Sequence, residues 1–401
     1  MAEQPVNDAI NLVSGEFWGR NPHDEFRWMR QNAPVYWDPH GGVWGISKHA
    51  DLRLVSRTPE VFSSAQGIRA DNPAMPMMID MDDPEHKMRR KLISSGFTPR
   101  RVADQEHYLR RICDEIIDEV CERGECDFVS DVAAMLPLIV IGDALGFRPE
   151  DRGMLLEWSD DMLRALTGGD NPELMVKAAE AFGGFNEYAG KAIEERRTCP
   201  MDDLLSVLVH AEVDGDRLDH DSLLQESLLI LIGGDETTRH VISGGMYQLC
   251  LHPGQRRLLL DDPGLIPTAV EEMLRWVSPI KNMNRTATRD FELRGQTIKE
   301  GDKVLLLYPS ANRDEEVFTD PDRFDVTRTP NDHLAFGNGP HFCLGNSLAR
   351  LELKVMFERL LERLPDIEPV DDAEPSHRPA NFVSGYESLK VRFTPVPKLA
   401  G

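Results

Sequence analysis

Paired cysteines, long apolar runs and an excess of positive charge are all missing from this sequence of 401 residues. None of its six cysteines belongs to a Cys-x-x-Cys pair or has the histidine spacing of a zinc site, so we expect reduced thiols. Cys121 and Cys126 could form half of a metal site, but the second half is lacking. The apolar stretches 132–142 and 228–234 are too short to cross a bilayer, so no membrane span is expected.

The charge balance is acidic, with 45 Lys and Arg against 69 Asp and Glu and a net charge of −24 at pH 7. Binding to nucleic acid irrespective of sequence needs a clustered excess of basic side chains, so we expect no nucleic-acid partner. Residues 1–17 show no basic region followed by an apolar stretch, and we expect a cytoplasmic protein. A composition of 41% hydrophobic and 28% charged residues is typical of a folded chain.

Helical periodicity dominates the chain. Apolar spacing predicts helices over 108–120, 179–195, 222–251, 266–277 and 348–364. Ser222 and Gln225 have the spacing of a capping box at the start of the third of these helices. Short strands are predicted over 35–37, 43–46, 303–307 and 389–393. With no repeat and no Gly/Ser linker, the chain is predicted to form a single, mainly α domain over 1–401 with small sheets.

The segment 336–345, FGNGPHFCLG, surrounds Cys343 with glycines directly before a predicted helix. Unpaired backbone N–H groups and the positive end of the helix dipole favour a thiolate at such a position. Glycines also let the backbone approach a large flat group. A buried structural cysteine in a tight turn would explain an isolated Gly-x-x-x-Cys-x-Gly equally well, but the complete ten-residue pattern is more specific.

That pattern resembles the haem-binding signature of the cytochrome P450 superfamily, F-x-x-G-x-[HR]-x-C-x-G. It is matched by Phe336, Gly339, His341, Cys343 and Gly345. The resemblance implies the P450 fold, with haem b between an oxygen-binding helix and the cysteine loop. Cys343 would be the axial thiolate of the iron, which favours O–O bond cleavage.

A second pattern interrupts the long helix predicted over 222–251. Gly233 and Gly234 together cost about 2 kcal/mol of helix propensity, and polar residues follow where the flanking pattern is core-like. Such choices indicate a functional groove, although a glycine kink at a helix crossing is an alternative. By resemblance this is the oxygen-binding motif, in which Gly233 replaces a common alanine. Glu236 and Thr237 would be the catalytic pair that supplies protons, which favours a reductase-driven monooxygenase over a peroxygenase.

A third pattern places His86 and Arg90 on one face of a short predicted helix. The basic side of a solvated helix is the ordinary explanation. The resemblance instead assigns both residues to the haem propionates, with Arg285 and His341 as further donors.

Glu272 and Arg275 are three residues apart on a predicted helix, where an exposed ion pair would be ordinary. In the P450 family the corresponding pair is buried. Arg323 of the 321–324 segment would complete a structural triad that braces the cysteine loop, with Asp322 in place of the commoner glutamate.

The loop before His86 is rich in methionine, whose flexible side chains can mould around a large apolar ligand. Ordinary hydrophobic anchoring of a long loop explains this composition equally well. By resemblance, this loop and three other segments line the substrate cavity. The residues expected there are Met75, Met78, Ile79, Ile232, Gly234, Ile280, Met283 and Val383. Their apolar character predicts a lipid or terpenoid substrate.

The whole chain is similar to bacterial sterol side-chain hydroxylases, notably over 82–102 and 381–393. Those enzymes oxidise the terminal methyl carbon, C26 or C27, of cholesterol or cholest-4-en-3-one, often onward to the carboxylic acid. A branched fatty acid, another terpenoid or a polyketide remains the alternative substrate. A haem-thiolate lipid or gas binder without turnover is a further alternative, but it would not need the pair Glu236 and Thr237.

The chain carries neither a dinucleotide-binding fingerprint nor a cysteine set for an iron–sulfur cluster, so its electrons must come from outside. The resemblance implies a ferredoxin and a ferredoxin reductase that uses NAD(P)H. Basic residues suited to steering an acidic carrier are Arg89, Lys91, Arg100, Arg101, Arg110 and Arg111.

Overall fold

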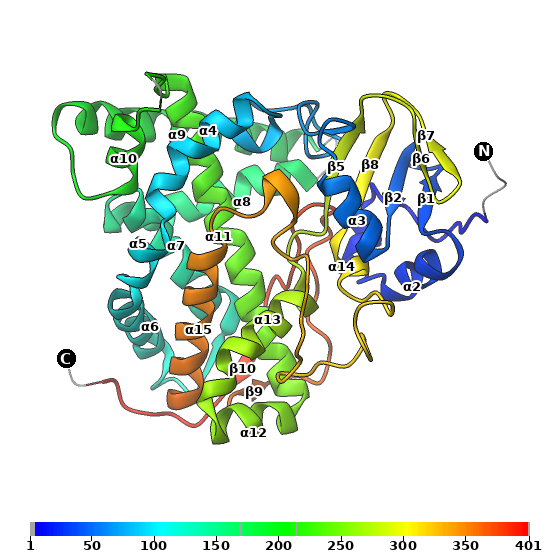
Figure 1. Cartoon of the computed structure of the whole chain (residues 1–401). Coiled ribbons are helices and arrows are strands. Elements are labelled where there is room, and N and C mark those ends of the chain that lie inside the picture. The colour runs from blue at the N-terminus through cyan, green and yellow to red at the C-terminus, as the bar shows by residue number, and fades with distance from the viewer. Residues whose placement is uncertain (1–4, 168–170, 214, 400–401) are drawn as a thin grey trace.

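The computed structural model describes residues 5–167, 171–213 and 215–399. Helices make up most of this part, and the largest sheet lies at one side of the molecule (Figure 1). The prediction of a mainly α fold with small sheets is therefore confirmed.

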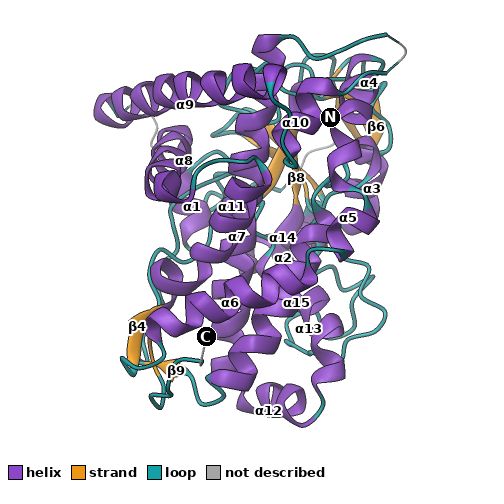
Figure 2. Cartoon of the chain, turned by 90° about the vertical axis from the view of Figure 1, so that its left-hand side faces the viewer, coloured by secondary structure: helices purple, strands orange, loops and turns teal. Residues whose placement is uncertain are grey.

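The helices are α1 (Gly15–Gly19), α2 (His23–Asn32), α3 (His49–Ser56), α4 (Glu85–Ser94), α5 (Pro99–Ala103), α6 (Glu106–Val120), α7 (Met135–Ala144), α8 (Arg152–Thr167), α9 (Pro172–Thr198), α10 (Leu204–His210), α11 (His220–Leu251), α12 (Pro253–Asp261), α13 (Ile266–Val277), α14 (Tyr308–Ala311) and α15 (Asn346–Arg363). The strands are β1 (Val35–Asp38), β2 (Val43–Ile46), β3 (Phe62–Ser63), β4 (Glu125–Asp127), β5 (Asn282–Ala287), β6 (Phe291–Leu293), β7 (Gln296–Ile298), β8 (Lys303–Leu307), β9 (Glu368–Pro369) and β10 (Lys390–Arg392). Figure 2 shows α9 across one end of the molecule and α12 at the other.

Helix α11 runs through the centre of the molecule, and α7, α13 and α15 pack against it (Figure 1). The side chain of Asp219 caps its start by accepting a hydrogen bond of 2.8 Å from the backbone N–H of Ser222. The predicted capping box of Ser222 and Gln225 is therefore wrong. Aspartate is a strong N-cap residue, and the helix begins before Ser222.

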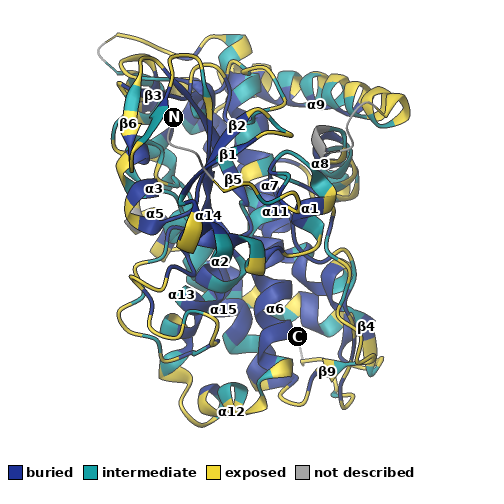
Figure 3. Ribbon diagram, turned by 90° about the vertical axis from the view of Figure 1, so that its right-hand side faces the viewer, coloured by how far each residue is buried: buried dark blue, intermediate teal, exposed yellow. Residues whose placement is uncertain are grey.

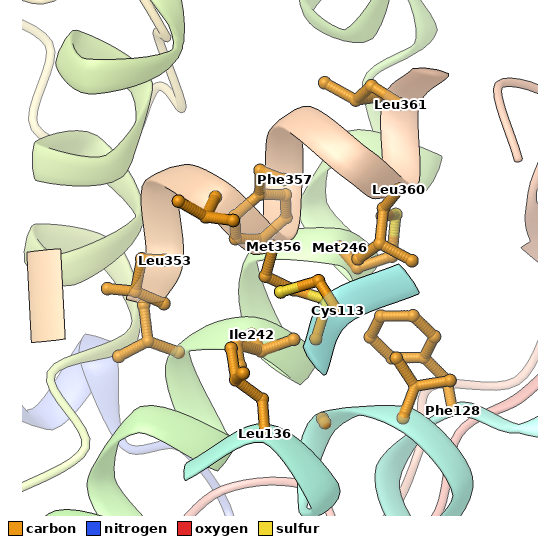
Figure 4. Close-up of a cluster of buried hydrophobic side chains, with 14 of the residues drawn as sticks. Cys113, Phe128, Leu136, Ile242, Met246, Leu353, Met356, Phe357, Leu360 and Leu361 are labelled. Atoms are coloured by element: carbon orange, nitrogen blue, oxygen red, sulfur yellow. The ribbon is translucent and has the colours of Figure 1, made fainter. Parts of the chain in front are cut away.

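The main apolar core lies between α11 and α15 (Figure 4). Met356, Phe357 and Leu360 of α15 point toward Ile242 and Met246 of α11. All five side chains are fully buried, so this contact stabilises the helix that follows the cysteine loop against the central helix.

The largest sheet has the strand order β1-β2-β8-β5-β3. Strands β2 and β8 are parallel, and the other neighbours are antiparallel. Figure 3 shows that these strands are largely buried. Strand β5 was not predicted, because its sequence NMNRTA is polar and lacks the alternation of a half-buried strand. In the part of the chain that the structure describes, no helix is both long and apolar enough to span a membrane.

A buried carboxylate, Glu272, organises the region before the cysteine loop. Arg275 donates two hydrogen bonds to it, at 2.7 and 2.8 Å. Arg328 donates a third at 3.1 Å, and the backbone N–H of Asp325 a fourth at 2.9 Å. The pair of Glu272 and Arg275 is therefore buried rather than solvated.

The predicted third member of this cluster, Arg323, is wrong. Its side chain is 63% exposed and lies 3.7 Å from Asp325, whereas the side chain of Arg328 is 10% exposed and contacts Glu272. The chain turns so that the backbone carbonyl of Arg323, rather than its guanidinium, faces inward and accepts from Arg275 and Arg328.

Because Arg328 is buried against Glu272 and Arg323 is exposed, substitutions at these two positions should lower the free energy of unfolding by different amounts. Arg328→Met leaves the buried carboxylate of Glu272 short of one cation and should lower the free energy of unfolding by about 2–4 kcal/mol. Arg323→Met, the matched control, removes only an exposed side chain and should change it by less than about 0.5 kcal/mol. Chemical denaturation of the two variants measures both values, and equal losses would contradict the assignment of Arg328.

Candidate active site

Cys343 lies in a tight loop directly before α15. Its backbone N–H donates to the carbonyl of Phe336 at 2.9 Å, which closes the loop. Gly339 has a φ of 73°, and a Cβ there would lie 2.2 Å from the carbonyl oxygen of Ser56. Only glycine fits this close approach, so the pattern of glycines around the cysteine has a steric cause.

Burial raises the pKa of the Cys343 thiol, while the N–H groups of Gly345 and Asn346 and the charges of Arg90 and Arg350 lower it. The N–H groups at the start of α15 thus lower the pKa of the thiol as expected, but burial raises this pKa by more. A thiol whose pKa is raised in this way becomes a thiolate when a metal ion replaces its proton.

An apolar cavity extends from Cys343 to the middle of α11. Its described lining includes most of the residues predicted for the cofactor and the substrate: Met78, Ile79, His86, Arg90, Gly233, Gly234, Thr237, Ile280, Met283, Phe336, His341, Cys343 and Gly345. Other predicted residues lie outside this lining: Met75, Ile232, Glu236, Arg285 and Val383. Val383 is bridged to Ile280 and packs beside Met283, directly behind the cavity wall.

Helix α11 is continuous through its glycine pair, which excludes a break there. A Cβ at Gly234 would come within 2.9 Å of Ile141, so this glycine lets α7 pack closely against α11. At Gly233 a Cβ would meet no atom within 4 Å, because that position faces the cavity. Thr237 also lines the cavity, and its hydroxyl donates to the carbonyl of Gly233 at 3.0 Å. These positions support a groove rather than a kink.

Glu236 faces away from the cavity, and its side chain is 1% exposed. Its carboxylate lies 3.0 Å from Arg239, 3.1 Å from His240 and 3.1 Å from Arg378. Burial acts to raise the pKa of Glu236, but these three neighbours outweigh it and hold the pKa well below the usual range. Glu236 is thus an ionised carboxylate held behind Thr237.

Basic side chains gather at one edge of the cavity, with Arg285 just outside its lining. The guanidinium of Arg285 is buried and donates to the carbonyl of Asn284 at 2.7 Å, and the described residues offer it no ion pair. The rings of His86 and His341 lie 4.1 Å apart. Burial, followed by the charges of Arg285, His86 and Arg90, lowers the pKa of His341 to about 3. His86 lies 3.2 Å from Asp83, whereas Arg285 and Arg90 have no carboxylate within ion-pair distance among the described residues. These two arginines therefore suit a dianionic group.

The site thus combines a thiol that lines the cavity, apolar walls and an edge with two arginines and two histidines, and this set of side chains fits haem b. Comparison with known proteins identifies the family. The Cytochrome P450 family model matches residues 264–393. "Steroid C26-monooxygenase" of Mycobacterium tuberculosis is 54% identical over 401 residues and covers 100% of both chains. The protein of the same name from Mycolicibacterium smegmatis is 51% identical, also over 100% of both chains.

The chain belongs to the cytochrome P450 family. Among solved structures, a Mycobacterium marinum cytochrome P450 in complex with pseudoionone has a TM-score of 0.89 and 36% identity, covering 98% of this chain and 100% of that one. CYP109E1 from Bacillus megaterium in complex with testosterone has a TM-score of 0.86 and 34% identity, covering 93% and 99%.

Several residues of this P450 cavity were not predicted. Ile141 of α7 and Tyr308 are among them, and Glu352 of α15 is the most unusual. Burial, with a smaller contribution from Asp235, raises the pKa of Glu352 to about 8. Its signal in the sequence was an acidic residue between Leu351 and Leu353 on a helix predicted to pack inward.

Glu352 predicts a dependence of stability on pH. The unfolded carboxyl ionises near its ordinary pKa of 4.5, whereas the folded one keeps its proton up to about 8. Unfolding therefore releases a proton in this range, and stability falls as the pH rises from about 4.5 to about 8. Glu352→Gln should remove this part of the decline and make the haem-loaded protein more stable than the wild type at pH 8.

Denaturant unfolding at several pH values measures this effect. Glu362→Gln is the matched control, because Glu362 is exposed on the same helix, and it should keep the wild-type slope. Parallel pH profiles for Glu352→Gln and the wild type would contradict a protonated Glu352.

Proposed function

We propose that the protein is a haem-thiolate monooxygenase that hydroxylates the terminal methyl carbon of a steroid side chain, with the whole chain 1–401 acting as one domain. The observation that carries this proposal is its 51–54% identity, over the full length, to two mycobacterial proteins named steroid C26-monooxygenase. The apolar cavity beside Cys343 supports it, since a steroid needs such walls.

In this proposal Cys343 would hold the haem iron through its thiolate, and Phe336 and Gly345 would frame its loop. Arg285, Arg90, His86 and His341 hold the propionates through charge-assisted hydrogen bonds. When bound, the haem supplies dioxygen activation and oxidation of a C–H bond.

Thr237 and Glu236 have different parts in this reaction. The hydroxyl of Thr237 faces the cavity and passes a proton toward the site of oxygen activation. Glu236 is held behind it as an ionised carboxylate by Arg378 and His240. Opening of one of these contacts would raise its pKa, so that it takes up a proton from solvent and passes it to Thr237. Gly233 leaves room for this exchange next to Thr237.

The substrate is positioned by the walls rather than by reactivity. The apolar lining residues Met78, Ile79, Ile280 and Met283 would restrict how the steroid enters, so that the slim side chain rather than the ring system reaches the haem. This places the terminal carbon of the side chain nearest the reaction site. Repeated oxidation of that carbon to the carboxylic acid follows the same positioning.

A methyl-branched fatty acid is the second candidate substrate. "Methyl-branched lipid omega-hydroxylase" of Mycobacterium bovis is 37% identical, covering 98% of this chain and 96% of that protein. A terminal methyl branch presents the same kind of carbon as a steroid side chain.

Titration of the ferric, haem-loaded protein distinguishes these substrates. Cholest-4-en-3-one should displace the axial water and shift the Soret band from low to high spin, and turnover should place the hydroxyl on the terminal methyl carbon. A shift with a methyl-branched fatty acid alone would discard the steroid and keep the monooxygenase.

We propose that a ferredoxin and its NAD(P)H-dependent reductase supply the electrons. Of the six basic residues predicted to steer the ferredoxin, we propose Arg100 and Arg101 as the docking residues. Arg89 forms an ion pair with the buried Glu226 at 3.3 Å. Arg110 and Arg111 also form ion pairs with nearby glutamates of this chain. Arg100 and Arg101 are exposed on α5, which packs against α15, the helix that follows the cysteine loop.

The double variant Arg100→Gln, Arg101→Gln should therefore slow reduction by a ferredoxin and flatten its dependence on ionic strength. Lys177→Gln, Lys191→Gln is the matched control, because it removes the same charge from exposed positions on α9. Stopped-flow reduction measures both, and equal rates in the two double variants would remove α5 from the docking surface.

A further inference from the structure

A second cavity, of about 420 Å³, lies along a different face of α11. One of its walls is formed by the α11 residues His240, Gly244, Tyr247 and Gln248. The apolar cavity beside Cys343, called the haem-side cavity below, is instead lined by Thr237 and Val241 of this helix. Further walls come from the start of α2, the end of α13 with Lys281, the segment with Arg313 and Asp322, and the C-terminal loop. The volume exceeds that of several water molecules, at about 30 Å³ each. Its lining is largely polar, and none of the residues assigned to holding the haem, passing the proton or positioning the steroid belongs to it.

Lys281 is the central charged group of this second cavity. Its residue is 6% exposed, and its ammonium donates to the carbonyl of Val277 at 3.1 Å. Within the described residues, no carboxylate lies within ion-pair distance of it. Burial, and then the charge of Arg313, lowers the pKa of Lys281 to about 7. A buried ammonium without an anion is costly, so this arrangement lacks a negative partner.

Two histidines from distant parts of the chain face the same space. His23 begins α2, and His377 lies in the C-terminal loop. Nδ1 of His23 and Nε2 of His377 are buried and have no hydrogen-bond partner among the described residues. Burial lowers the pKa of both rings, and Lys281 contributes to both shifts. Every charge that shifts these two rings is positive.

The two carboxylates of the lining, Asp322 and Glu374, do not contact Lys281. Asp322 accepts from Arg313 at 2.9 Å and from Arg27 at 2.7 Å. Glu374 is 64% exposed and lies 4.0 Å from His377, at the edge of the cavity. Neither carboxylate lies within ion-pair distance of Lys281, so its ammonium, when protonated, has no carboxylate partner among the described residues.

We propose that this cavity is a binding site for a small multivalent oxyanion, for which inorganic phosphate is the probe. Lys281 is its main ligand, and His23 and His377 donate hydrogen bonds from opposite ends of the chain. A charge-assisted hydrogen bond in a site shielded from water is stronger than one in solvent.

The bound oxyanion connects segments that also form the substrate cavity. Lys281 directly follows Ile280, which lines the haem-side cavity and is bridged to Val383. His377 belongs to the same C-terminal loop as Val383 and is bridged to Tyr386. The anion therefore holds the C-terminal loop against the segment that leads into β5.

Calorimetric titration of the haem-loaded protein with phosphate, at constant ionic strength set with chloride, tests the site. The wild type should show saturable binding and a rise in Tm that saturates over the same concentrations. Lys281→Met should weaken phosphate binding by about 10- to 100-fold. Lys299→Met, the matched control at an exposed lysine, should bind like the wild type.

Without phosphate, Lys281→Met should be at least as stable as the wild type, because it removes an unpaired buried charge. His377→Gln provides a second variant and should also weaken binding. Absence of saturable phosphate binding by the wild type, or equal binding by the wild type, Lys281→Met and His377→Gln, would overturn the proposal. A rise in Tm of equal size with chloride alone would assign the effect to screening and overturn it as well.

Discussion

The position of one thiol constrains the rest of this molecule. Its loop is closed by the Cys343 N–H and needs glycine at position 339 against Ser56, and in the proposed function this geometry presents the sulfur to haem. Neighbouring carboxylates of α13 then hold the flanking segments. Glu271 bonds Arg350 of α15 and His333 before the loop, and Glu272 bonds Arg275 and Arg328. The buried ion pairs therefore serve the geometry of the loop.

Helix α11 separates two environments with opposite chemistry. On one side Gly233 and Thr237 face an apolar cavity that suits a steroid. On another side Glu236 and His240 enter a network of buried charges, and His240 reaches a polar cavity around Lys281. The polar residues in the middle of this apolar helix are explained by these two surroundings, because a buried charge needs partners that an apolar core does not supply.

Prediction from the sequence succeeded where a local pattern determines the structure. Periodicity located α11 and α15, and the glycines around Cys343 indicated its loop. It failed where distant segments decide. Strand β5 is polar and forms because β8 and β3 pair with it, and Arg328 replaces Arg323 because the chain turns between them.

The side chains of the cavity show the same division. Thr237 and Cys343 line it as their motifs predict, whereas Glu236 was expected at the cavity and lies behind it. Its direction depends on Arg378, 142 residues away in sequence. The buried carboxyl of Glu352 stood on a predicted helix, but its surroundings came only from the packing of α15 against α11.

The most direct test of this account is the absorption spectrum of the reduced protein under carbon monoxide, recorded for the wild type and for Cys343→His after loading with haem. The account predicts the red-shifted Soret band of a thiolate-ligated haem in the wild type and its loss in Cys343→His. A wild-type band at the position of a histidine-ligated haem, unchanged in the variant, would show that Cys343 is not the axial ligand and would contradict the account.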